Sequence, residues 1–160
     1  KEFIDEYGEP VLVLACGTGR ITVPLVEEGI DITGIDISEP RLELAREKAS
    51  KKDADIDFIK ANMKDFSLNK RFKTIIIPVN SIQLLTEIEE YEALFSNIHD
   101  HLTEDGRMIL QIFNPNLDIL QRDPDEEFDV TEYDEPYGEG KIKLTEKSQY
   151  RSTEQVLDIN

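Results

Sequence analysis

The sequence has little cysteine, little positive charge and no long apolar run. Its single cysteine, Cys16, cannot form an internal disulfide, so we expect a reducing compartment, the cytoplasm. Lysine and arginine number 18 against 35 aspartate and glutamate residues, a formal net charge of −17. This charge repels phosphate backbones and argues against nucleic acid as a partner. Apolar runs such as Ile75–Ile77 are too short to cross a bilayer, so no membrane partner is expected.

The 160 residues fit about one domain, in two parts of different composition. Residues 1–115 are expected to form a Rossmann-like cofactor-binding core. Residues 116–160 are expected to form an acidic linker or lid followed by an antiparallel hairpin, because residues 121–140 carry nine acids against one base and residues 141–160 alternate polar and apolar positions. The chain begins at Lys1 rather than Met and ends on a strand-like pattern, so we interpret it as a fragment.

Strand-like and helix-like patterns alternate through the first part. The strand-like segments are residues 11–15, 31–37, 56–62, 73–79 and 107–113, with a turn expected at Asp105–Gly106. This alternation predicts an α/β fold, a doubly wound and mostly parallel sheet of strand order 3-2-1-4-5 with helices on both faces. A ligand crevice is then expected at the carboxyl ends of the strands.

The most specific stretch is VLVLACGTGR, in which a buried strand runs directly into two glycines. Gly17 and Gly19 suit a tight strand-to-helix turn where a ligand approaches the main chain. Dinucleotides require Gly-x-Gly-x-x-Gly, and Thr22 occupies the third position here, so that fingerprint is incomplete and helix packing is expected to be looser.

LACGTGR, followed by ITGIDIS at the end of the second strand, resembles the class I S-adenosylmethionine-dependent methyltransferases over about residues 1–115. IIIPVNSIQLL after the fourth strand is similar to a subgroup of small members. The resemblance implies S-adenosylmethionine as cofactor, S-adenosylhomocysteine as product, and methyl transfer by direct displacement. The positions matched to cofactor binding are Ala15, Cys16, Gly17, Thr18, Gly19, Asp36, Ile37, Asn62, Met63 and Asn80. Those matched to substrate binding are Ser81, Gln83 and Asn114.

Residue chemistry agrees with these roles and also leaves alternatives open. A carboxylate such as Asp36 accepts two hydrogen bonds and so suits the ribose diol. Asn62 could accept the adenine amine or equally cap a turn. The family usually has an acid at the position of Val13, where it supports the cofactor's amino group. That departure, with a C-terminus that looks cut, keeps open a module that binds the cofactor or a partner without turnover. An NAD-binding Rossmann protein is a further alternative, because dinucleotides also use a glycine turn of this kind.

The acceptor is not named by the sequence, and no catalytic residue is singled out. We expect a small molecule or a basic protein to enter between Asn80–Gln83 and Asn114–Asn116. The acidic stretch after Leu120 would form an outer rim that favours a cationic or neutral acceptor.

Other residues have plainer interpretations. Cys16 could be a thiol of lowered pKa, but packing is favoured because no histidine supports it. His99 and His101 lie on different faces of a helix, which argues against a metal pair and places both at the surface or its edge. Thr86–Glu89 is predicted to be a capping box for that helix. No metal site is expected.

Overall fold

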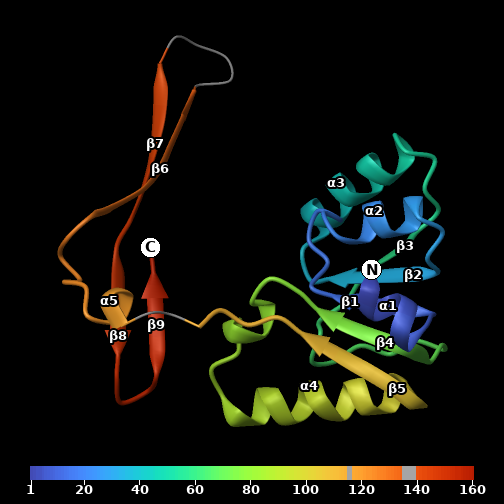
Figure 1. Cartoon of the computed structure of the whole chain (residues 1–160). Coiled ribbons are helices and arrows are strands. Elements are labelled where there is room, and N and C mark those ends of the chain that lie inside the picture. Colours follow the sequence, from blue (N-terminus) through green and yellow to red (C-terminus); the bar gives the residue numbers. More distant parts are fainter. Residues whose placement is uncertain (115–116, 135–139) are drawn as a thin grey trace. The chain divides into compact units, whose positions relative to one another are not determined.

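The computed structural model describes residues 1–114, 117–134 and 140–160, and it divides into two compact units, Lys1–Phe113 and Asn114–Asn160. The first unit alternates strands and helices (Figure 1). Its elements are α1 (Glu2–Tyr7), β1 (Val11–Leu14), α2 (Thr22–Glu27), β2 (Ile32–Asp36), α3 (Glu39–Ser50), β3 (Asp57–Lys60), β4 (Phe72–Ile77), the 3₁₀ helix η1 (Ser81–Leu84), α4 (Ile88–His101) and β5 (Leu102–Leu110).

The strands of this unit form one parallel sheet of order β3-β2-β1-β4-β5, which confirms the predicted topology. β1 lies in the centre, where Val11 pairs with Ile32 of β2 and with Thr74 of β4. All of its residues are fully buried because both faces of the sheet are covered, which explains its continuous apolar run.

Alternate side chains of β1 enter two separate cores. Val11 and Val13 pack with α1, α2 and α3 on one face. Leu12 and Leu14 pack with η1 and α4 on the other face. Figure 1 shows α2 and α3 on the opposite side of the sheet from α4, so the carboxyl edge of β1 is held from both sides.

Two local predictions near α4 and β5 are wrong by a small shift. Asp105–Gly106 lies inside β5 rather than in a turn, at a register irregularity where a Cβ on Gly106 would come within 3.0 Å of the Phe72 carbonyl oxygen. The capping box of α4 is formed by Glu87 and Glu90, one residue later than predicted, because Glu87 is the residue with extended N-cap geometry.

His101 is buried, which corrects its predicted place at the surface, whereas the side chain of His99 is 89% exposed. The Nε2 atom of His101 accepts the Leu68 N–H at 3.0 Å, and its Nδ1 atom lies 2.8 Å from the Asn97 carbonyl oxygen. The ring can make both bonds only when neutral. The His101 ring thereby links the loop after β3 to the end of α4 through hydrogen bonds.

The second unit contains α5 (Leu117–Leu120), β6 (Phe128–Asp134), β7 (Lys141–Glu146), β8 (Ser148–Arg151) and β9 (Val156–Ile159). β8 and β9 form the predicted antiparallel hairpin. β7 pairs with β6 instead, so the acidic stretch contains a strand that the sequence did not predict. Ion pairs between Lys141 and Glu132 and between Lys143 and Asp129, at 2.6 and 2.7 Å, offset part of its charge.

The described part of the chain offers no helix with the length and apolar character to span a bilayer. Within the same residues, no cluster of three or more histidine, cysteine or acidic side chains is arranged to hold a metal ion.

Candidate functional site

The two glycines of the loop after β1 serve different purposes. Both have left-handed backbone, with φ of +57° at Gly17 and +72° at Gly19. A Cβ on Gly19 would lie 3.0 Å from Val23 Cγ2 and 3.2 Å from Ala45 Cβ, so this glycine allows α2 and α3 to pack closely. A Cβ on Gly17 would meet nothing within 4 Å, so its backbone faces open space where a ligand can approach.

Asp36 ends β2 and is only 3% exposed. Its Oδ2 atom accepts the Gly17 N–H at 2.8 Å, and its Oδ1 atom accepts the Ser38 N–H at 2.9 Å. Each carboxylate oxygen has a further lone pair for a ligand hydroxyl. From the other side, the Lys48 ammonium donates to the carbonyl and hydroxyl oxygens of Thr18, at 3.1 and 2.9 Å. The loop is therefore fixed before any ligand binds.

A cavity of about 280 Å³ lies at the carboxyl edge of the sheet, beside Asp36. It is lined by Ala15, Asp36, Ile37, Arg41, Ala61, Asn62, Met63, Lys64, Ser81, Leu84, Leu85 and Glu90. Its volume is near the lower end of small-molecule pockets, which run from about 300 Å³ upward. The cavity therefore suits a nucleoside-sized part of a ligand.

One wall of this cavity is an ion pair between Lys64, after β3, and Glu90, in the first turn of α4. The pKa of Glu90 is lowered, first by the hydrogen bond from Lys64 and then by the backbone N–H groups of Thr86 and Glu87. The pair joins two segments that are 26 residues apart. The sequence does not predict this ion pair; it predicts only the capping box at the start of α4.

Cys16 is a packing residue rather than a reactive thiol. Burial raises the pKa of Cys16 to about 12, and the negative charge of Asp36 adds to the effect. A thiol with this pKa stays protonated at neutral pH and is a weak nucleophile.

We expect Cys16 to resist alkylation by iodoacetamide at pH 8 in the folded chain and to react readily in urea. Because the thiol ionises near pH 9 when unfolded and only near pH 12 when folded, its contribution to stability is complete below pH 9 and is lost as the pH rises from 9 to 12. Mass spectrometry of the labelled chain reads out the single site. Equal labelling rates in the two states would contradict this environment.

The comparisons with known proteins agree with this geometry. Residues 11–106 match the profile of a methyltransferase domain family. The chain belongs to this methyltransferase family. A putative methyltransferase of Geobacillus sp. (strain WCH70), GWCH70_2453, is 32% identical over 112 residues, which are 70% of this chain and 45% of that protein. The family predicted from LACGTGR and ITGIDIS is thus confirmed.

Two solved structures share the fold of this methyltransferase domain. The CcbJ methyltransferase from Streptomyces caelestis aligns with a TM-score of 0.82 and 23% identity, over 99% of this chain and 62% of that one. The glycopeptide N-methyltransferase MtfA complexed with S-adenosyl-L-homocysteine aligns with a TM-score of 0.66 and 26% identity, over 99% and 69%. The chain spans about half the length of the curated relatives it matches.

The structure of this methyltransferase domain brings some of the predicted residues together and not others. Around the cavity it gathers Ala15, Asp36, Ile37, Asn62, Met63 and Ser81. Cys16, Gly17, Thr18 and Gly19 form the adjoining loop, and Asn80 lies outside the lining, with left-handed φ of +64° before η1. Sequence reasoning missed Arg41, Ala61, Lys64, Leu84, Leu85 and Glu90.

Two predicted side chains, those of Asn62 and Gln83, have other contacts. The Oδ1 atom of Asn62 accepts the Lys64 N–H at 3.1 Å, so this residue shapes a turn. The Gln83 amide exchanges two hydrogen bonds with the backbone of Phe113, at 3.0 and 2.7 Å. Asn114 belongs to the second unit, and Pro115 and Asn116 lie outside the described residues. Substrate roles for Gln83 and Asn114 stay predictions.

Thr22 and Val13 are the positions at which the sequence departs from the dinucleotide fingerprint and from the usual methyltransferase pattern, respectively. Thr22 is fully buried, and a Cβ on Gly19 would lie 3.0 Å from Val23 and 3.2 Å from Ala45, in α2 and α3. Looser helix-to-strand packing at this loop stays a prediction. Val13 is also fully buried in the core beneath α2 and α3, where its side chain has no access to a ligand.

Proposed function

We propose that this methyltransferase domain binds S-adenosylmethionine at the carboxyl ends of β1 and β2 and passes its methyl group to an acceptor nucleophile by direct displacement. The observation that carries the proposal is the buried Asp36 carboxylate, fixed at 2.8 Å from the backbone of an open glycine. Family membership supports the reaction class and the cofactor.

The residues present fit the cofactor. Asp36 retains one acceptor site on each oxygen, which matches the two hydroxyls of a ribose. The space where a Cβ of Gly17 would stand is free for the ligand's approach to the main chain. Ile37, 65% exposed at the cavity, offers an apolar surface for the adenine, and Met63 packs partly into the core beside it.

When bound, S-adenosylmethionine supplies an electrophilic methyl group on a sulfonium. The task of the protein is then to hold donor and acceptor in line, and positioning alone can provide about 7–11 kcal/mol of such a barrier. A neutral amine or a thiolate needs no dedicated base. Asp36 and the glycine loop bind and position the donor.

An amine is the acceptor that we favour. MtfA, at 26% identity, is named an N-methyltransferase. The formal charge of −17 attracts cationic acceptors, leaves neutral ones unaffected and disfavours nucleic acid, so the acceptor is a small molecule or a basic protein. A cytoplasmic location, inferred from the single cysteine, stays a prediction.

Calorimetric titration with S-adenosylhomocysteine and with NAD tests the cofactor. We expect saturable binding of S-adenosylhomocysteine and none of NAD, because Thr22 replaces the third glycine of the dinucleotide fingerprint. Binding of NAD with no response to S-adenosylhomocysteine would reject the proposal in favour of the dinucleotide alternative.

A module that binds the cofactor without turnover is the second candidate, favoured by Val13, a buried apolar residue at the position where the family usually has an acid. An assay for S-adenosylhomocysteine release with a panel of amines, phenols and basic proteins distinguishes the two. Release with any acceptor supports the enzyme; cofactor binding with no release across the panel supports the module.

A further inference from the structure

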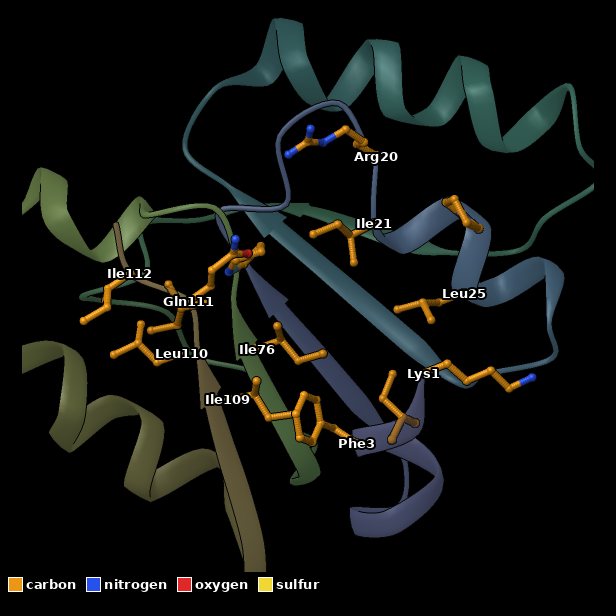
Figure 2. Close-up of a pocket in the computed structure, with 14 residues that line it drawn as sticks. Lys1, Phe3, Arg20, Ile21, Leu25, Ile76, Ile109, Leu110, Gln111 and Ile112 are labelled. Carbon is orange, nitrogen blue, oxygen red and sulfur yellow. The ribbon is translucent and has the colours of Figure 1, made fainter. Parts of the chain in front are cut away.

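A second and larger cavity, of about 780 Å³, opens on the sheet face that carries α1 and α2. Figure 2 shows Ile76 of β4 in the middle of it, Ile109 of β5 beside Phe3 at one end, and Arg20 at the other end. Ile76 and Ile109 are register partners in the sheet and are only partly buried. They form the floor of the cavity.

The helices on this face are unevenly placed. α2 and α3 pack on β2 and β3, and α1 contacts β4. Among the described residues, the apolar floor over β4 and β5 is open to the cavity.

The lining has the composition of a ligand pocket. Polar side chains come from three residues, Lys1, Arg20 and Gln111, and the other lining residues are apolar. Arg20 follows Gly19 directly, and Gln111 follows the end of β5, where its Oε1 atom accepts the Val79 N–H at 3.2 Å. Two of the three polar groups thus lie at the end nearest the glycine loop. Small-molecule sites combine an apolar lining with a few convergent polar groups in this way.

We propose that this pocket holds an apolar arm of the methyl acceptor, whose nucleophile lies at the end marked by Arg20 and Gln111. This inference rests on the proposed function, because it assigns the acceptor to the side of the glycine loop that the donor leaves free. The acceptor class is then an amine with a hydrocarbon or aromatic body that extends over Ile76 and Ile109, and a short hydrophilic amine is a poor substrate.

A fluorescence titration with N-phenyl-1-naphthylamine, a neutral apolar probe, tests the pocket in the chain saturated with S-adenosylhomocysteine. We expect saturable binding that n-decylamine displaces and ethanolamine does not. Ile109→Trp places a larger side chain into the open space and should weaken probe binding at least tenfold. Leu44→Trp, on an exposed position of α3, is the matched control and should leave probe binding unchanged.

The methyl-transfer assay extends the test to catalysis. With primary n-alkylamines, kcat/KM should rise about three- to fourfold for each added methylene until the pocket is full, and this rise should flatten in Ile109→Trp. A value of kcat/KM that is independent of chain length would overturn the inference, as would probe binding that Ile109→Trp leaves intact.

Two further outcomes separate the inference from its premise. If the probe binds but calorimetry detects no S-adenosylhomocysteine binding, the proposed function is rejected. The acceptor assignment, which rests on it, is then rejected as well. If S-adenosylhomocysteine binds and sedimentation shows a dimer that Ile109→Trp dissociates, a second copy occupies the pocket and the inference alone is overturned.

Discussion

Gly19→Ala is expected to lower the free energy of unfolding by about 2–5 kcal/mol. A left-handed backbone costs a residue with a Cβ about 1–2 kcal/mol, and overpacking a tight site adds about 1–3 kcal/mol. Here φ is +72°, and the new methyl group would lie 3.0 Å from Val23 and 3.2 Å from Ala45. Urea denaturation followed by circular dichroism measures the change.

Gly17→Ala is the matched control for the packing term. Its φ of +57° carries the same backbone cost, but nothing lies within 4 Å of the added Cβ, so we expect a loss of only about 1–2 kcal/mol. The methyl group would instead stand in the space assigned to the ligand, so S-adenosylhomocysteine binding should fall sharply in this folded variant. Equal unfolding midpoints for the two variants would show that packing against α2 and α3 does not explain Gly19.

Asp36→Asn is expected to weaken S-adenosylhomocysteine binding about 10- to 150-fold. A hydrogen bond to a charged group contributes about 1.5–3 kcal/mol, and about 1.4 kcal/mol corresponds to a factor of ten. An amide has a single acceptor oxygen, so its NH₂ group must face either the Gly17 N–H or the Ser38 N–H. The ribose and the loop both lose an acceptor, and calorimetry measures the combined loss.

Two control measurements accompany this prediction. Asp57→Asn removes an exposed carboxylate at the start of β3 and should bind S-adenosylhomocysteine as the unchanged chain does. The pKa of Cys16 should fall in Asp36→Asn, because the Asp36 charge helps to raise it, and a thiol titration detects this. A folded Asp36→Asn variant with unchanged affinity would leave Asp36 as a support for the loop and nothing more.

The central sheet could be predicted because each strand is a local pattern. Val11–Leu14 and Ile75–Ile77 are apolar throughout, as expected for central strands of a parallel sheet that is covered on both faces. β6 could not be predicted in the same way. Its acids suggest a solvated linker, and its pairing depends on lysines such as Lys141, which follow several residues later.

The residues of the site also differ in whether a local sequence pattern predicts them. Asp36 is the last residue of β2, and Ile37 and Asn62 come just after strand ends, so the topology alone brings them to the carboxyl edge. Lys64 and Glu90 reach the cavity through an ion pair across 26 residues, and the Gln83 amide is used by Phe113, 30 residues away. Contacts at such separations depend on helix orientation and loop paths, which residue spacing does not specify.

The supports of the glycine loop all come from an early part of the chain. The Ile35 carbonyl oxygen accepts the Cys16 N–H at 2.9 Å, and Asp36 and Lys48 supply the remaining bonds. The floor of the larger cavity comes instead from β4 and β5. Under the proposed assignment of the two cavities, the donor side and the acceptor side can therefore change separately in evolution. Substitutions at positions such as Ile109 are then expected to give a lineage new acceptors while the segment from β1 to α3 keeps one donor.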